Sequence, residues 1–457
     1  MTDHDRQTLV EMDQQFVWHP FTPHSVYSDE APLMVVRGEG NYLIDADGSR
    51  YLDGVSSIWC NVFGHRKAEI DDAIAKQLTQ IAHSTFLGNA SAPGVELAAE
   101  LVRVTPESLQ RVFYSDSGST AVEVALKIAL QYWQQVPIEG AKKRTRFVTL
   151  RDAYHGDTVG SVSLGGMELF HARYGSLLFE TIEIPSPYCY RCSDGLDRAA
   201  CEAACIKKAV DIIQQHGDEI AALFIEPAVQ GAAGMIVQPE GYLLQVCEAA
   251  REAGALVIFD EVAVGFGRSG KSLFACEIEG FIPDILCLAK GLTGGYLPLA
   301  ATLTTEAIFE AFLGRPEEGK TFYHGHTYTG NALASAAALA TLKLMDAPDF
   351  LPGLREREAW FGEAIQRLSE NPWVGDIRRW GLMAGVELVK DRETKQAFES
   401  AERIGAKVCI AARQYGVFLR PLGDTLIFVP PLSIQKEEID LLVDAAHKSI
   451  LDVLGAQ

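Results

Sequence analysis

Two short apolar runs, each followed by one chemically active side chain, constrain this chain more than any other feature. The run Ala255–Phe259 leads into Asp260, and the run Ile285–Ala289 leads into Lys290. Runs of consecutive apolar residues predict strands that are buried on both faces, as in parallel sheets. Parallel strands end at the same edge of a sheet, where α/β proteins bind their ligands. We therefore expect a carboxylate and an amine close together at one edge of a sheet.

Through the middle of the chain, short apolar segments alternate with helical patterns, which predicts an α/β fold with a mainly parallel sheet covered on both faces. The expected strands are rich in β-branched and aromatic residues and span 111–115, 146–150, 221–226, 255–260 and 284–288. The segment 33–52 instead predicts a small antiparallel unit, with a turn at Asp47-Gly48.

The C-terminal part of the chain changes character. Amphipathic helices are expected at 354–368, at 404–415 and from Lys436 onward, with strands near 381–388 and 426–429. We expect residues 1–80 to contribute to a small domain, 81–345 to form the large α/β domain, and 346–457 to form an α+β domain.

The composition excludes several classes of protein. Of the 457 residues, 48% are hydrophobic and 22% are charged, as in ordinary globular proteins. The formal net charge of -21 argues against a nucleic-acid surface, which needs clustered lysine and arginine. The first residues lack the apolar core of a signal peptide, and no apolar stretch reaches the roughly 20 residues of a membrane span. We therefore expect a cytoplasmic protein with neither a nucleic-acid nor a membrane partner.

Four of the nine cysteines lie close together in the sequence. Cys189 and Cys192 form a C-x-x-C pair, and Cys201 and Cys205 are expected one turn apart on a helix. Four thiolates at this spacing can hold a structural zinc ion. A surface insertion with oxidisable thiols gives the same pattern. Both interpretations stay open, and neither gives these cysteines a catalytic role.

The pair Asp260 and Lys290 suits the chemistry of pyridoxal phosphate. The amine can form a Schiff base with the aldehyde of this cofactor, and the carboxylate can keep the pyridine nitrogen protonated so that the ring accepts electrons. Small residues flank Lys290, so partial desolvation would lower its pKa and favour the neutral amine. Lys290 alone could be a surface lysine, and the prediction therefore depends on both residues.

Other polar groups are expected at the same edge of the sheet. Gly118 and Ser119 open a helix directly after a strand, and the N–H groups there suit a phosphate, although S-G-S is equally good as a helix cap. Tyr154 follows the strand 146–150 and can stack on a planar ring, or it can close the core beneath a loop. Glu226 ends another strand and can hydrogen-bond a cofactor or substrate.

The stretch 321–331, T-F-Y-H-G-H-T-Y-T-G-N, is dense in polar and aromatic residues. We expect His326 and Thr327 beside the cofactor, with the Thr327 hydroxyl on its phosphate, and Gly325 beside the substrate.

The segment Gly265–Gly270 matches G-x-G-x-x-G, the pattern of dinucleotide-binding sites. Such a site requires the glycines to open a crossover helix directly after a strand. Here D-E-V-A-V separates the motif from its strand, and the K-S-L-F-A that follows lacks a helical pattern. The dinucleotide interpretation is therefore rejected.

Residues 257–295 resemble the class III aminotransferases, which are pyridoxal phosphate enzymes of fold type I, and the resemblance extends over nearly the whole chain. It implies that Lys290 is the Schiff-base lysine and that Asp260 is the partner of the ring nitrogen. It also implies that Gly118 and Ser119 belong to the phosphate cup.

The same resemblance implies that Tyr154 stacks over the cofactor ring. In this family the threonine that matches Thr327 reaches the phosphate of the neighbouring subunit. A homodimer with shared active sites is therefore implied, acting on a small-molecule amino donor and a keto-acid acceptor.

Within this class, the segments 18–22 (W-H-P-F-T) and 116–119 resemble the enzymes that convert 8-amino-7-oxononanoate to 7,8-diaminononanoate in biotin biosynthesis. The resemblance implies that Arg420 pairs with a substrate carboxylate, for which a planar guanidinium is suited. It also places Phe21 and Trp59 beside the substrate. A class III aminotransferase acting on ornithine, 4-aminobutyrate or a diamine is the alternative.

The resemblance leaves two amino donors, S-adenosylmethionine and L-lysine. Enzymes that use S-adenosylmethionine typically carry tyrosines where this chain has Phe21 and Phe428, and a tryptophan where it has Ile58. The residues present favour lysine and exclude neither donor.

Overall fold

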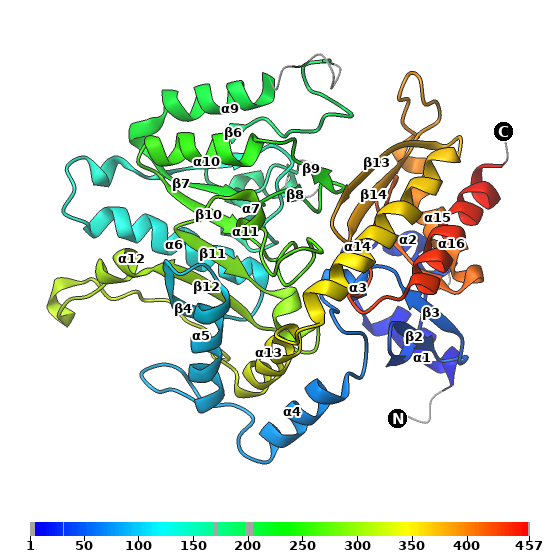
Figure 1. Cartoon of the computed structure of the whole chain (residues 1–457), viewed down its shortest axis with the longest axis horizontal. Coiled ribbons are helices and arrows are strands. Elements are labelled where there is room, and N and C mark those ends of the chain that lie inside the picture. The colour runs from blue at the N-terminus through cyan, green and yellow to red at the C-terminus, as the bar shows by residue number, and fades with distance from the viewer. Residues whose placement is uncertain (1–4, 31, 168–171, 197–200, 202–203, 456–457) are drawn as a thin grey trace.

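A seven-stranded sheet forms the centre of the larger part of the molecule (Figure 1). The computed structural model describes all residues except 1–4, 31, 168–171, 197–200, 202–203 and 456–457. The strands, in spatial order, are β4 (Leu109–Ser115), β12 (Ala300–Thr305), β11 (Ile285–Leu288), β10 (Leu256–Asp260), β7 (Ile220–Ile225), β5 (Arg146–Leu150) and β6 (Ile182–Ile184). β12 runs antiparallel to both of its neighbours, and the other pairs are parallel. The predicted α/β fold with a mainly parallel sheet is confirmed.

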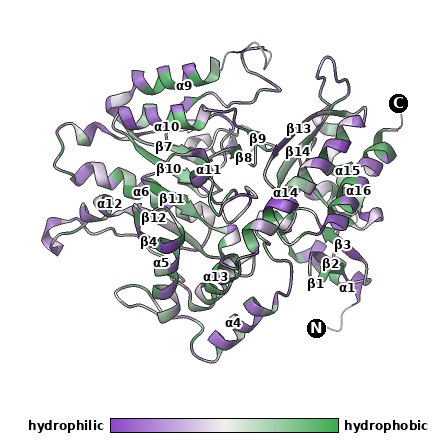
Figure 2. Ribbon diagram, in the orientation of Figure 1, coloured by the Kyte–Doolittle hydropathy of each residue, from purple (hydrophilic) through white to green (hydrophobic). Residues whose placement is uncertain are grey.

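Helices cover both faces of this sheet. Successive side chains of a strand point to opposite faces, so each strand packs against the helices on both sides. In β10, Leu256 and Ile258 pack in the cluster that contains the α6 side chains, whereas Val257 and Phe259 pack in the cluster that contains those of α10. Every residue of β10 is buried, and the central strands are hydrophobic along their length (Figure 2). Burial on both faces explains why these strands read as unbroken apolar runs.

Long and short helices surround the large sheet. They are α4 (Ala68–Leu78), α5 (Ala92–Val104), α6 (Gly118–Gln135), α7 (Val159–Ser163), α9 (Ala204–Gln215), α10 (Tyr242–Glu252), α11 (Cys276–Glu279), α12 (Glu306–Glu310) and α13 (Ala332–Met345). Cys201 lies in a bend and Cys205 lies on α9, so the expectation that the two share a helix is wrong. In the described part of the chain, no helix is long and apolar enough to cross a membrane.

Two smaller sheets lie beside the large one, on the side where both chain ends are found (Figure 1). The first contains β1 (Val35–Glu39), β2 (Tyr42–Asp45), β3 (Arg50–Asp53) and β15 (Val417–Phe418). The second contains β13 (Val374–Trp380), β14 (Met383–Leu388), β17 (Thr425–Phe428) and β16 (Arg420–Leu422). The accompanying helices are α1 (Arg6–Phe16), α2 (His24–Tyr27), α3 (Ser56–Trp59), α14 (Phe350–Gln366), α15 (Ile404–Ala411) and α16 (Lys436–Leu454).

The two ends of the chain share the first of these sheets. β15 pairs with β3 in parallel, with Val417 opposite Leu52. The predicted antiparallel unit at 33–52 is present as β1–β3. The domain limits at residues 80 and 345 stay a prediction.

Candidate active site

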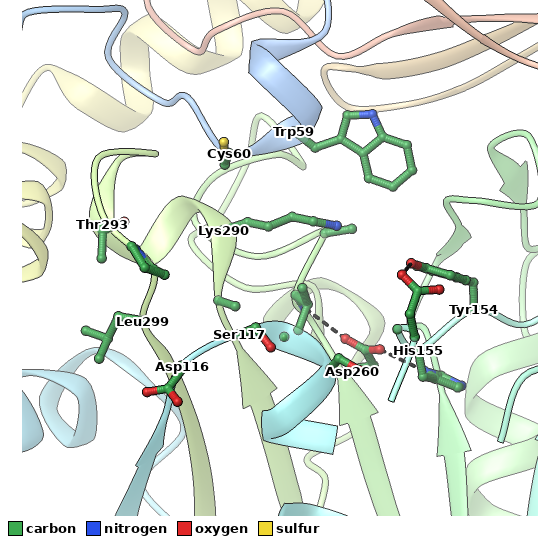
Figure 3. A pocket seen from close by; sticks show the side chains of 18 of the residues that line it. Trp59, Cys60, Asp116, Ser117, Tyr154, His155, Asp260, Lys290, Thr293 and Leu299 are labelled. Atoms are coloured by element: carbon green, nitrogen blue, oxygen red, sulfur yellow. Dashed lines mark hydrogen bonds and ion pairs between the residues drawn. The ribbon is translucent and has the colours of Figure 1, made fainter. Parts of the chain in front are cut away.

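A cavity of about 710 Å³ opens at the edge of the large sheet where β5, β7, β10 and β11 end (Figure 3). The sequence-predicted residues that line it come from separate elements and are Trp59, Gly118, Ser119, Tyr154, Glu226, Asp260 and Lys290. The strand register explains part of this convergence, because Asp260 lies opposite Cys287 and the chain reaches Lys290 just beyond that pair.

Lys290 begins the short 3-10 helix η5 (Lys290–Thr293) with φ +47°. Its Nζ lies 4.6 Å from the centre of the Trp59 ring, and among the described residues it has no hydrogen-bond or ion-pair partner. Burial lowers the pKa of Lys290, although the charges of Asp260 and Glu226 act in the opposite direction. The amine is therefore shifted toward its neutral, nucleophilic form.

Asp260 ends β10 and is held by two contacts. Its Oδ2 lies 2.7 Å from Nδ1 of the fully buried His155, and its Oδ1 accepts a hydrogen bond of 3.0 Å from the N–H of Val262. Burial alone would lower the pKa of His155, but the hydrogen bond and charge of Asp260 outweigh burial and raise it. The raised pKa favours the protonated imidazole, which orients this carboxylate and stabilises its negative charge beside the cavity (Figure 3).

Glu226 follows β7 and is also buried. Its two oxygens accept hydrogen bonds from the N–H groups of Tyr154 (3.2 Å) and Gly231 (2.9 Å). Burial nevertheless raises the pKa of Glu226 to about 7. The phenol of Tyr154 donates to Asp157 at 2.8 Å. Glu226 thus ties the loop after β5 to the loop after β7, and both loops line the cavity.

Glu226→Gln is expected to flatten the pH dependence of stability between about pH 4.5 and 7. Because the pKa of Glu226 is higher in the folded protein than its ordinary value of 4.5, the folded state binds more protons than the unfolded state over this interval. The free energy of unfolding therefore falls as pH rises, by about 3 kcal/mol in total for this group. Urea denaturation of the cofactor-free protein at pH 5 and pH 7.5 measures the difference.

Glu183→Gln is the matched control for this experiment, since Glu183 is an exposed carboxylate paired with Arg151. Its stability curve should run parallel to that of the wild type. Parallel curves for the wild type and Glu226→Gln would contradict the assignment.

The N-terminus of α6 forms a backbone cradle at the cavity floor, with Ser117 as its cap. A Cβ on Gly118 would lie 2.5 Å from Cγ1 of Val262. Gly156 has φ +120°, and a Cβ there would lie 2.3 Å from Oγ of Ser119. Both positions therefore require glycine. The unobstructed N–H groups and the helix dipole make this an anion site.

Trp59 is carried by α3, a turn whose backbone is left-handed throughout. Ser56, Ser57, Ile58 and Trp59 have φ values of +48°, +53°, +87° and +68°. Left-handed backbone costs about 1–2 kcal/mol per residue when a side chain is present. The turn is held from outside by Arg268, whose guanidinium donates to the carbonyl oxygens of Trp59, Asn61 and Pro430.

Several sequence-predicted residues lie outside the cavity of the single chain. Phe21 is 60% exposed, and Gly325, Thr327 and Arg420 are exposed as well. His326 lies 2.8 Å from Asp116, which lines the cavity. The roles given to these residues stay predictions.

Sequence reasoning missed two residues that shape this site. His155 belongs to the Tyr154–Thr158 segment, but nothing in its spacing pointed to Asp260. Arg268 lies in the rejected glycine-rich motif and is fully buried, with its pKa lowered to about 10 by burial. An arginine between glycines in an apolar stretch was the available signal for a buried charge that binds backbone oxygens.

Cys189, Cys192, Cys201 and Cys205 are not among the residues that line the cavity, and the nearby Tyr188 and Arg191 bind Glu387 on β14. Burial raises the pKa of Cys205, and the neighbouring Cys189 and Cys201 add to this. Within the described residues, no three histidine, cysteine or acidic side chains are placed to hold a metal ion.

Comparison with known proteins agrees with this geometry. The family model for aminotransferase class-III matches residues 24–450. An adenosylmethionine-8-amino-7-oxononanoate aminotransferase of Geobacter sulfurreducens is 50% identical, with 100% of each chain covered. The crystal structure of the enzyme of that name from Methanocaldococcus jannaschii has a TM-score of 0.93 and 44% identity, covering 98% of this chain and 100% of the other.

A second solved structure is an (S)-enantioselective omega-transaminase from Thermomicrobium roseum. Its TM-score is 0.92 at 34% identity, covering 99% of this chain and 100% of that one. The match to the family model spans nearly the whole chain and includes every residue that lines the cavity. The chain therefore belongs to the class III aminotransferases.

Proposed function

We propose that this aminotransferase converts 8-amino-7-oxononanoate to 7,8-diaminononanoate in biotin biosynthesis, with S-adenosylmethionine as the amino donor. The geometry that supports transamination is that of the Lys290 amine, which lies between Trp59 and the buried Asp260 and has no hydrogen-bond or ion-pair partner in the described part of the chain. The choice of substrate is supported by the name of the Geobacter sulfurreducens relative, which matches this chain from end to end.

Two of the three positions behind the sequence preference for lysine lie outside the cavity of the single chain, and the third, Ile58, directly precedes Trp59 on α3. Phe428 is fully buried on β17, and Phe21 is exposed outside the cavity. Neither replaced tyrosine position therefore bears on the cavity of the single chain. The names of the Geobacter sulfurreducens and Methanocaldococcus jannaschii enzymes both specify adenosylmethionine, which favours that donor for this chain.

The cofactor is pyridoxal 5′-phosphate, which supplies an aldehyde that bonds to amines and a ring that accepts electrons. The residues present fit this group. Gly118 and Gly156 leave room at a helix N-terminus where a Cβ would intrude, which suits the phosphate. Asp260, backed by His155, suits a protonated ring nitrogen, and the Lys290 amine has no competing partner among the described residues.

In this proposal Lys290 Nζ moves the proton of the reaction. Its lowered pKa favours the neutral amine, so Nζ can take a proton from the amine-bearing carbon of the donor and deliver it to the carbon that carries the cofactor's aldehyde. Asp260 keeps a negative charge near the site, and His155 prevents that carboxylate from turning away. Trp59 lies over Nζ and forms one wall of the cavity.

Assembly and location complete the proposal. We infer a cytoplasmic homodimer in which Thr327 and Arg420, both exposed in the single chain, serve an active site shared between subunits. Thr327 would contact the partner's phosphate, and Arg420 would pair with a substrate carboxylate.

The test is product formation from 8-amino-7-oxononanoate, with diamine followed by mass spectrometry. S-adenosylmethionine, lysine and 4-aminobutyrate are supplied separately as donors. Formation of the diamine with S-adenosylmethionine is the expected result. Formation of the diamine with lysine alone would overturn the assignment of S-adenosylmethionine as the donor. Absence of diamine with every donor, while an amine still bleaches the cofactor band, would favour an omega-transaminase such as the one from Thermomicrobium roseum, whose fold is equally similar.

Gly156→Ala is expected to weaken cofactor binding at least tenfold. The added Cβ would lie 2.3 Å from Oγ of Ser119, and φ +120° is itself unfavourable for alanine. Titration of the apoprotein, followed by the visible absorbance of the bound cofactor, gives the affinity. Gly140→Ala is the matched control, because Gly140 also has positive φ but no atom lies within 4 Å of its added Cβ. Equal affinities for the two variants would contradict the cradle.

A further inference from the structure

Contacts from outside the left-handed turn Ser56–Trp59 must stabilise its backbone conformation. None of its four residues is glycine, and the nearest glycines are Gly54 before the turn and Gly64 after it. Backbone in this region persists only where the surrounding structure leaves no alternative, and such sites cluster around functional groups. Two buried side chains outside the turn bind it: Arg268 binds its carbonyl end, and Asp53 binds Ser57 in its middle.

Asp53 is the side chain that binds the turn from below. It ends β3, and its carboxylate is completely buried. Oδ1 accepts a hydrogen bond of 2.9 Å from the N–H of Ser57, and Oδ2 accepts one of 2.6 Å from the Ser57 hydroxyl. Oδ2 also lies 3.2 Å from Nε2 of His65. A charged acceptor thus engages both polar groups of a residue in the middle of the turn, which makes these bonds stronger than neutral ones.

The turn in its left-handed form sets the position of the Trp59 ring. The indole lies over Lys290 Nζ at 4.6 Å (Figure 3). On its other side it packs close to Gly231, where an added Cβ would lie 2.9 Å from Cζ3 of Trp59. Relaxation of the turn to right-handed backbone would redirect the Cα–Cβ bond of Trp59 and move the ring out of this slot.

We propose that Asp53 is a positioning residue for the amino donor: it holds the left-handed turn and thereby keeps Trp59 as the wall against which the donor binds above Lys290. Asp53 does not line the cavity and acts only through the turn. The inference rests on the proposed function for the identity of the donor alone.

The first experiment compares Asp53→Asn with Asp45→Asn. Asp45 is a matched control, because it is also buried in the small antiparallel sheet and accepts from the N–H groups of Asp47 and Ser49 and from the Tyr51 hydroxyl. Asp53→Asn should raise KM for S-adenosylmethionine at least tenfold, with kcat within threefold and cofactor affinity unchanged. Asp45→Asn should leave KM within twofold. Equal KM values for wild type and Asp53→Asn would overturn the proposal.

Hydrogen exchange gives a readout that is independent of turnover. In the turn, the N–H of Trp59 bonds to the carbonyl of Val55 and that of Cys60 to the carbonyl of Ser56. Exchange of these amides should accelerate in Asp53→Asn and stay at the wild-type rate in Asp45→Asn. Unchanged exchange in both variants would overturn the role of Asp53 in holding the turn.

A double-mutant cycle with Trp59→Ala separates positioning from general loss of structure. If Asp53 acts through Trp59, adding Asp53→Asn to Trp59→Ala should raise KM by less than twofold. A tenfold further rise would show that Asp53 acts by another route. If Asp53→Asn folds poorly, Ser57→Ala is the milder variant. It removes only the hydrogen bond from the Ser57 hydroxyl and should raise KM for the donor about threefold.

The two proposals fail in distinguishable ways. If the wild type makes no diamine, the proposed substrate is wrong, and the same cycle is run with whichever of lysine and 4-aminobutyrate bleaches the cofactor band. If the wild type makes diamine and the cycle shows no coupling, the positioning role alone is wrong.

Discussion

Lys290→Ala is expected to reduce transamination by at least ~10⁴-fold while the protein still folds and binds its cofactor. The variant loses the amine that bonds to the cofactor aldehyde and the Nζ that moves the proton, and no other described lysine lines the cavity. Folding should survive, since this Nζ has no hydrogen-bond or ion-pair partner among the described residues. The measurement is the diamine assay, with cofactor content followed by absorbance and folding by thermal unfolding.

Lys271→Ala is the control, because Lys271 is exposed and lies outside the cavity. It should keep wild-type turnover. Substantial activity in Lys290→Ala with bound cofactor would remove Lys290 from the mechanism, whatever the substrate.

Asp260→Asn is expected to lower kcat by roughly 10²–10³-fold. The amide keeps the shape of the carboxylate but removes the negative charge that would face the ring nitrogen, and the loss of one group that stabilises charge in the transition state typically costs about 10²–10³-fold in kcat. The pKa of His155, which this carboxylate raises, would also fall in the variant.

Asp284→Asn tests whether the effect belongs to the cavity. Asp284 precedes β11 on the same sheet, and its carboxylate accepts from the N–H of Val257 at 2.8 Å, at the edge opposite the cavity. This variant should lose stability without a comparable loss of kcat. Similar kcat values for Asp260→Asn and the wild type would contradict the assignment of Asp260.

The parts of the fold that were predictable are those in which local sequence and burial agree. β10 and β11 read as apolar runs because both faces of each strand are covered, and their ends therefore placed Asp260 and Lys290 correctly. β12 has the sequence A-A-T-L-T-T, in which buried threonines bond to backbone and resemble an exposed strand. It was missed for that reason, and the antiparallel pairings with it.

The site was predictable where the required residue type is itself unusual. A lysine directly after a buried strand is unusual, and so are glycines at a helix N-terminus. Both can therefore be recognised as candidate site residues from the sequence alone. The left-handed turn under Trp59 was not predictable, since no glycine or asparagine marks it and the groups that hold it, Asp53 and Arg268, are distant in sequence or hidden in another motif. The residues that a partner subunit would supply were likewise not predictable from the elements of one chain, because they depend on how two chains assemble.

The pairing of β3 with β15 gives the enzyme a fixed order of maturation. Val417 pairs with Leu52, and the Ser56 hydroxyl donates to the carbonyl of Val429. The turn that places Trp59 over Lys290 is therefore held by contacts between the first and last portions of the chain. During synthesis the large sheet is complete long before residues 417–429 leave the ribosome. Contacts so distant in sequence close slowly, because the entropy of a long loop is lost before the contact forms. In a nascent chain, Lys290 and Asp260 can therefore reach the edge of the large sheet before the turn that carries Trp59 is closed against residues 417–429.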